Sequence, residues 1–199
     1  MNLLAHQLLS KNETELAIGN FIADAVKGKQ YLNYSEGIQN GILLHRRIDF
    51  FMDHNEITIE GMKRLRGDFS KYSTVIIDVF YDHFIAKNWE VYHHLSLLDF
   101  TQKQYQILLG HIDEIPERLR MMLHYLEKEN WMYDYRKIEG IESALLGMSR
   151  RIKHDFQLDK AVKILIEHYD EYEAEVTAFM PIISAKIPEW LEEINSSKS

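Results

Sequence analysis

The sequence predicts an all-α protein, a single-domain helical bundle over residues 1–199. Three observations lead to this prediction. Apolar residues recur at helical spacing in a chain rich in Leu, Ile, Met, Glu, Lys and Gln. No segment alternates apolar and polar residues as a half-buried strand would. With three prolines, nine glycines and no repeat or linker, the chain has nothing that divides it into several domains.

The helix boundaries are predicted from caps and helix-ending residues. Asn12 or Thr14 is expected to cap the second helix, which ends at Gly28, and Ser35 is expected to cap the third. Pro181 is expected to break the last helix. The predicted helices cover 2–9, the segment from 12 or 14 to 28, the run 41–53, 74–86, 101–112, 116–133, 138–154 and 159–194. Residues 58–66 are expected to form one or two basic amphipathic turns, and loops are expected at Tyr31–Asn33 and Trp89–Ser96.

Composition excludes several classes of protein. The chain has no cysteine, which rules out disulfides and thiolate sites and fits a cytoplasmic protein. A metal would therefore need His, Asp, Glu or backbone oxygen, as suits Mg, Mn, Fe or Zn. No apolar stretch is long enough to span a bilayer, and a net charge of −8 argues against a nucleic-acid binder.

Two apolar helical runs contain acids and histidines. The run TVIIDVFYDHFIA places Asp78, Asp82 and His83 among apolar side chains without any Lys or Arg, and GILLHRRIDFFMD contains His45 and Asp49. A buried carboxylate must neutralise, find a partner or bind a metal. Because both runs are expected to be buried, the sequence predicts a shared polar pocket that a divalent cation could neutralise.

Helical geometry relates some of these groups directly. His45, Asp49 and Asp53 are four residues apart, so they follow one face of their helix. Asp24 ends another apolar run, and His6 lies on the first helix. Helical bundles build metal sites from side chains on facing helices, and such sites support hydrolysis by activating water.

Each residue also has a purely structural interpretation. Asp78 and Asp82 could form salt bridges with arginines of other helices. His45 could be a hydrogen-bonded core histidine, and His6 taken alone is more often structural. The combination of acids in three apolar helices favours a metal site over these separate explanations.

Six motifs resemble the acyl carrier protein phosphodiesterase family. They are MNLLAH, GNFIADAVKG, GILLHRRIDFFMD, DVFYDHFIAKNW and the later GI and MSRR, in order and spacing from Met1 to about Arg151. The resemblance implies a distorted HD-domain-like metallo-phosphohydrolase fold. It also implies hydrolysis of the phosphodiester that joins 4′-phosphopantetheine to a serine of holo-acyl carrier protein, with a divalent metal, typically manganese; Mg and Fe remain alternatives.

The resemblance also assigns residues. It implies a metal-centred site to which His83 also belongs, and Arg46 as the group that binds phosphate. In such a site, His83 or His45 is expected to act as the general acid. The residues that it implies as metal ligands are Asp24, His45, Asp49, Asp78, Asp82 and His6.

An acidic carrier protein as partner raises a question of charge, because this chain is acidic too. Recognition would need a local basic surface, and the sequence offers two, which are Lys63, Arg64, Arg66 and Lys71, and Arg150, Arg151 and Lys153. Both could instead be ordinary solvated helix faces. Two other functions stay open: an HD-like phosphohydrolase of a nucleotide or other small phosphoester, and a non-catalytic helical module that binds a partner.

Overall fold

The computed structural model describes residues 3–150 and 156–196, and all regular structure in these ranges is helical. The predicted all-α fold is confirmed. The 3₁₀ segments are short and connect or extend the helices. The α-helices are α1 Leu3–Leu9, α2 Thr14–Ile22, α3 Glu36–His54, α4 Glu56–Phe69, α5 Ser73–Lys87, α6 Leu97–Gly110, α7 Glu117–Lys128, α8 Trp131–Asp134, α9 Ile138–Ser149, α10 Val162–Glu167 and α11 Tyr169–Ser196.

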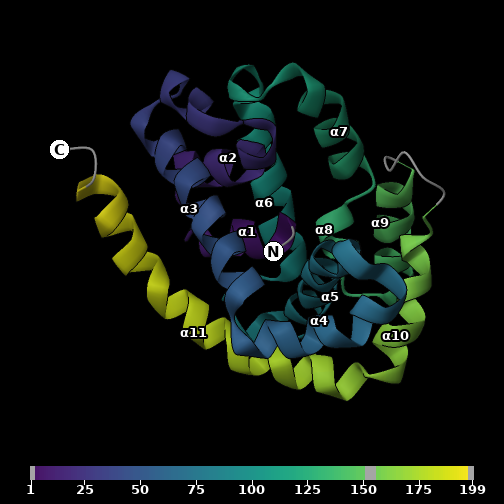
Figure 1. Ribbon diagram of the computed structural model, residues 1–199. Helices are drawn as coiled ribbons and strands as arrows, with labels where there is room; N and C mark the ends of the chain where they lie inside the picture. The colour runs from purple at the N-terminus through teal and green to yellow at the C-terminus, as the bar shows by residue number, and fades with distance from the viewer. Residues whose placement is uncertain (1–2, 151–155, 197–199) are drawn as a thin grey trace.

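Helix α1 lies in the middle of the bundle, with α2 and α3 on one side and α4 and α5 on another (Figure 1). It contacts both α2 and α5. Helix α5 is apolar around most of its circumference, and eleven of its residues, including Asp82 and His83, are buried. The buried apolar side chains of the described helices form one continuous cluster. This arrangement brings the first helix, α3 and α5 together around a common interior.

Two glycines set the distance between α2 and α3. A Cβ added at Gly19 would lie 2.3 Å from the Ile38 carbonyl oxygen and 2.6 Å from the Gly41 Cα. A Cβ at Gly41 would lie 2.5 Å from the Leu16 carbonyl oxygen. Only glycine permits backbones this close. The contact holds the residues that follow on each helix, Asn20 on α2 and His45 on α3, in a fixed relation.

Several predicted boundaries are wrong, and local backbone geometry explains them. Helix α2 ends at Ile22 rather than Gly28, because a 3₁₀ turn over Ala23–Ala25 ends the α-helical hydrogen bonding. Glu13, not Asn12 or Thr14, occupies its N-cap position, without a side-chain cap bond. Ser35 is the N-cap of α3 as predicted, but its hydroxyl donates to Glu15 Oε1 instead of accepting a backbone N–H.

The later helices are divided at other places than predicted. The segment 116–133 splits into α7 and α8 because Asn130 adopts a left-handed conformation with φ 46°. The last predicted helix breaks at His168 and not at Pro181, which lies inside α11. Packing of Phe179 and Met180 in the core holds the helix through the proline. Residues 31–33, predicted as a loop, form the end of a 3₁₀ helix, Gly28–Asn33. The last part of the helix predicted over 138–154 lies outside the described residues.

Among the described residues, no helix is both long and apolar enough to cross a membrane.

Candidate functional site

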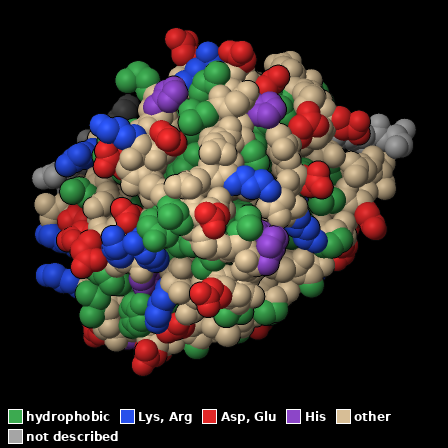
Figure 2. Space-filling view, turned by 180° about the vertical axis from the view of Figure 1, so that it is seen from behind, with side chains coloured by type: hydrophobic (Ala, Val, Ile, Leu, Met, Phe, Trp, Pro, Cys, Tyr) green, Lys and Arg blue, Asp and Glu red, His purple; other side chains and the backbone are tan. Residues whose placement is uncertain are grey.

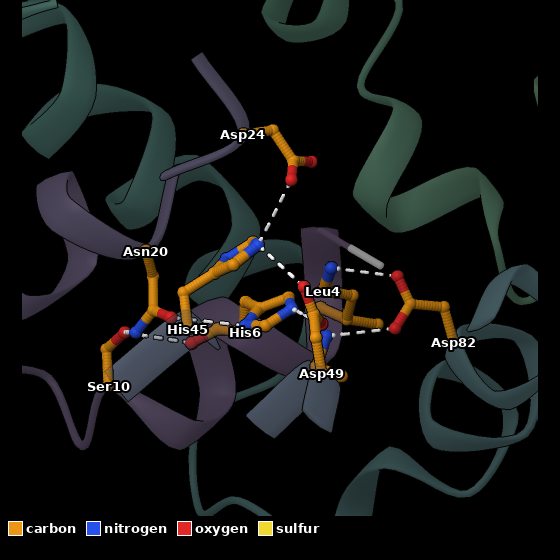
Figure 3. Close-up of polar contacts among 9 residues, drawn as sticks. Leu4, His6, Ser10, Asn20, Asp24, His45, Asp49 and Asp82 are labelled. Carbon is orange, nitrogen blue, oxygen red and sulfur yellow. Dashed lines mark hydrogen bonds and ion pairs between the residues drawn. The ribbon is translucent and has the colours of Figure 1, made fainter. Parts of the chain in front are cut away.

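Three side chains from α1 and α3 converge at the centre of the bundle (Figure 3). His6 Nε2 lies 3.1 Å from Asp49 Oδ1, and His45 Nε2 lies 3.0 Å from Asp49 Oδ2. The two imidazole rings are stacked, with centroids 3.9 Å apart. One ligand atom from each residue falls within 4.8 Å of the others. Asp53, the next residue in the predicted row, is exposed and lies outside this His–Asp cluster.

A chain of hydrogen bonds determines which nitrogen of His6 carries its proton. The Ser10 hydroxyl donates to the His6 carbonyl oxygen at 2.8 Å, so it must accept the 2.8 Å bond from Asn20 Nδ2. This leaves Asn20 Oδ1 facing His6 Nδ1 at 3.1 Å, and that oxygen can only accept. The neutral His6 ring therefore carries its proton on Nδ1 and a lone pair on Nε2.

The His–Asp cluster therefore fits a cation. In its neutral form, His6 directs the Nε2 lone pair at a carboxylate oxygen of Asp49, so two acceptors face each other at 3.1 Å. A proton or a metal ion must lie between them. Metal-binding histidines usually donate their second N–H to a nearby oxygen, as His6 does to Asn20. His6, His45 and Asp49 supply the nitrogen and oxygen ligands that suit a divalent metal.

The pKa values indicate a tightly coupled cluster. Burial and the neighbouring His45 lower the pKa of His6 to about 4, although Asp49 opposes them. Burial also acts against the charge of His45, but the carboxylates of Asp24 and Asp49 outweigh it and raise the pKa of His45 to about 9. Burial would raise the pKa of Asp49, yet nearby positive charge, together with the contacts to both histidines, holds it far below its ordinary value. Asp49 is thus a carboxylate between two buried histidines, with its own side chain partly exposed.

Asp24 lies at the rim of the cluster. Its Oδ1 is 3.4 Å from His45 Nε2, but its side chain is 90% exposed. The contact with His45 lowers the pKa of Asp24. Two arginines hold the 3₁₀ turn that carries it: Arg46 donates to the Val26 carbonyl at 2.8 Å, and Arg118 donates to the Ala25 carbonyl.

An apolar cavity of about 200 Å³ opens beside the cluster. Its polar wall consists of the cluster histidines with Asn20 and Asp24. No lysine or arginine lines it within the described chain. Arg46, the predicted phosphate-binding residue, instead lines a separate surface pocket beside Tyr31. The other residues around the apolar cavity are Leu3, Phe21, Met122, Leu126, Trp131, Tyr135, Gly147 and Met148.

The acids of α5 occupy different surroundings. Asp82 is fully buried and accepts hydrogen bonds from the backbone N–H groups of Leu4 at 2.9 Å and Ala5 at 3.0 Å. It thereby satisfies the first turn of α1, whose N–H groups have no partner within the helix. Burial raises its pKa to about 7, partly offset by these two hydrogen bonds. Asp78, on the same helix, has a pKa that burial raises to about 6.

His83 is not brought into the His–Asp cluster. Its Nδ1 lies 2.8 Å from the Tyr135 carbonyl oxygen, and its Nε2 lies 2.7 Å from the Tyr169 hydroxyl. A carbonyl only accepts, so Nδ1 carries the proton and Nε2 accepts from Tyr169. Burial lowers the pKa of His83. The ring is a neutral link between α5 and the helices around Tyr135 and Tyr169.

The predicted basic surfaces are partly neutralised. Lys63 pairs with Glu60, and Arg64 pairs with Glu175 and lies over the Tyr172 ring. Arg150 lines a larger cavity beside α8 and α9, while Arg151 and Lys153 lie outside the described residues. On the face that Figure 2 shows, basic and acidic side chains are intermixed rather than gathered into one basic field.

Sequence reasoning missed four residues around the site. Asn20, Ser10, Arg118 and Trp131 were not expected to take part, although Asn20 stands in the motif GNFIAD. The sequence did contain a signal for Asn20, because a side-chain amide within an apolar run needs a hydrogen-bond partner when it is buried. Trp131 and Arg118 gave no comparable signal, because only the fold places them at the cavity and beside Asp24.

The fold and the site together define a class of protein, a helical bundle with a His–Asp cluster that could hold a metal ion beside an apolar cavity. The family model for acyl carrier protein phosphodiesterase matches residues 1–183. The chain belongs to this family.

Relatives in the family cover nearly the whole chain. An acyl carrier protein phosphodiesterase of Yersinia pestis is 30% identical over 182 residues, which are 91% of this chain and 94% of the relative. One of Escherichia coli O6:H1 is 31% identical over 183 residues, with the same coverage. One of Photorhabdus laumondii is 27% identical over 187 residues, 94% of each chain. No solved structure matches this chain.

Proposed function

We propose that this protein is a metal-dependent phosphodiesterase that hydrolyses the bond between 4′-phosphopantetheine and the serine of holo-acyl carrier protein. Family membership supports the reaction and the carrier-protein substrate. The observation that carries the mechanism is the His–Asp cluster, in which acceptor atoms of His6 and Asp49 face each other at 3.1 Å. A cytoplasmic location, which fits the cysteine-free composition, is part of this proposal.

His6, His45 and Asp49 hold the divalent cation, with manganese expected and magnesium or iron as alternatives. When bound, the ion polarises a phosphoryl oxygen and lowers the pKa of a water molecule. Asn20 keeps the His6 Nε2 lone pair directed at the site. Asp24, exposed at the rim and 3.4 Å from His45, stays a predicted ligand of the cation.

The reaction adds water to phosphorus and breaks the bond to the serine oxygen, which must gain a proton. The general acid that supplies it stays a prediction, since His45 Nε2 faces Asp49 as a ligand atom, and a nitrogen that binds a cation carries no proton to donate. The earlier assignments of Arg46 and His83 to catalysis, and of Asp78 and Asp82 to the metal, stay predictions. In the structure, Arg46 and Arg118 position the turn of Asp24.

Intact-mass spectrometry of holo-acyl carrier protein incubated with this protein and manganese tests the proposal. We expect the carrier protein to lose the mass of 4′-phosphopantetheine, and we expect a chelator or Asp49→Asn to prevent the loss. An unchanged mass with a folded, manganese-loaded protein would refute carrier-protein hydrolysis and favour a small phosphoester. An unchanged mass without manganese uptake would favour the partner-binding module.

A further inference from the structure

The cavity beside the His–Asp cluster is lined mainly by apolar side chains. Phe21, Met122, Leu126, Trp131 and Met148 form its walls opposite the polar residues. A site that bound only a phosphate group would need donors and cations rather than these side chains. Its walls thus suit an uncharged chain attached to the phosphate.

We propose that this cavity binds the pantetheine arm of the phosphodiester, with Trp131 and Gly147 as the residues that shape its path. This inference rests on the proposed function. The serine on the other side of phosphorus belongs to a folded protein, which cannot enter a space of about 200 Å³. The pantetheine arm is a slender chain with only small branches, chiefly two methyl groups and one hydroxyl group, so it is the part of the substrate that fits.

A second cavity lies beside the first. It has a volume of about 610 Å³ and shares Trp131 and Gly147 with the first. Its lining includes Lys137, Ser143 and Arg150 together with three acidic residues, Glu129, Asp134 and Glu139. The arm carries amide groups towards its far end, and polar side chains can pair with them. The dimethyl end, next to the phosphate, lies in the apolar cavity, and the amide end extends into the larger one.

Gly147 and Trp131 line both cavities and lie against each other. A Cβ added at Gly147 would lie 2.9 Å from Trp131 Cη2, so any larger residue must displace the indole ring. Tyr125 packs against the ring edge-on, with centroids 5.7 Å apart. Gly147 lies inside α9, where alanine is the better helix former. Glycine here costs helix stability and leaves the space that the ring occupies.

The test is calorimetric titration of the manganese-loaded protein with 4′-phosphopantetheine and, separately, with inorganic phosphate. We expect 4′-phosphopantetheine to bind at least about tenfold more tightly than phosphate, because a filled apolar pocket adds at least that factor. We expect Gly147→Ala to weaken 4′-phosphopantetheine binding about tenfold and to leave phosphate binding unchanged. Gly67→Ala, where a Cβ meets nothing within 4 Å, is the matched control.

Tryptophan fluorescence gives a second readout that does not depend on turnover. Trp131 is the one tryptophan among the residues that line these two cavities in the described chain. Binding of 4′-phosphopantetheine should change the emission of the native protein and of Gly67→Ala, but not that of Trp131→Phe.

Equal affinities of 4′-phosphopantetheine and phosphate for the native protein, or unchanged 4′-phosphopantetheine binding by Gly147→Ala, would overturn the inference. Either result could coexist with hydrolysis of holo-acyl carrier protein, which would leave the proposed function standing. Tight 4′-phosphopantetheine binding without hydrolysis would refute the proposed function and support the cavity assignment.

Discussion

Replacing Asp82 distinguishes two roles of its carboxylate. One is to accept hydrogen bonds from the first turn of α1, and the other is the predicted role as a metal ligand. Its carboxylate oxygens accept the N–H groups of Leu4 and Ala5, and it is fully buried. Asp82→Ala leaves both buried donors without an acceptor, at about 1–3 kcal/mol each. We therefore expect a loss of about 2–6 kcal/mol in unfolding free energy. Asp82→Asn turns an NH₂ group towards one of the donors and should cost about half as much.

Replacing Asp82 should also affect the His–Asp cluster, because Asp82 holds the first turn of α1, which carries His6. Leu4 and Ala5 directly precede His6, so a loosened first turn displaces His6 Nε2 relative to Asp49. Weaker manganese binding should accompany the loss of stability. Asp68→Asn, at an exposed position, is the control and should change the unfolding free energy by no more than about 0.5 kcal/mol.

Urea denaturation with and without a chelator measures both effects. If Asp82 secures α1, its variants are destabilised in metal-free protein as much as in loaded protein. If metal-free Asp82→Asn is as stable as metal-free native protein, and differs only with manganese, then Asp82 is a metal ligand and the structural explanation is wrong.

The dependence on pH has a defined sign. Burial raises the folded-state pKa of Asp82 to about 7, above its ordinary value of 3.8. The stability that this group contributes is therefore full below about pH 4 and is lost as the pH rises through about 7. The deficit of Asp82→Asn relative to the native protein should shrink over this interval. If the difference in unfolding free energy between the native protein and Asp82→Asn grew with pH, the raised pKa of Asp82 would be contradicted.

Three further outcomes follow from the site and the helix packing. Asp49→Asn should abolish stoichiometric manganese binding in calorimetry, and full binding would refute its role as a ligand. Asn20→Ala should weaken manganese binding about 10- to 100-fold, because His6 Nδ1 loses its acceptor, whereas exposed Asn33→Ala should not. Gly19→Ala should lower the unfolding free energy by about 1–3 kcal/mol, since its Cβ would meet the backbone of α3 at 2.3 Å; an unchanged thermal midpoint would show that the two helices can separate.

The helix boundaries were the part of the fold that the sequence predicted least well. The helical periodicity identified nearly every helix, but Asn130 and His168 divide segments that the pattern shows as continuous. Neither residue is a strong helix breaker by type, and Pro181, which is one, lies inside a helix. Tertiary packing overrides the local preference at these positions.

The site was predicted best where its residues share one helix. His45 and Asp49 are neighbours because they are four residues apart on α3, and this relation holds in any fold that keeps the helix. Asp82 was correctly expected to be buried. Its partners could not be foreseen, because backbone N–H groups leave no trace in a residue pattern.

The sequence by itself determined the helical class and the acids within apolar helices, because periodicity and the cost of a buried charge act locally. Only the tertiary structure decided that His6 joins Asp49 and His45 while His83 faces Tyr135 and Tyr169 instead. Contacts between helices depend on how closely and at what angle their backbones pack. In this protein two contacts fix that geometry. They are the close glycine contact between α2 and α3 and the hydrogen bond from α1 to Asp82 of α5.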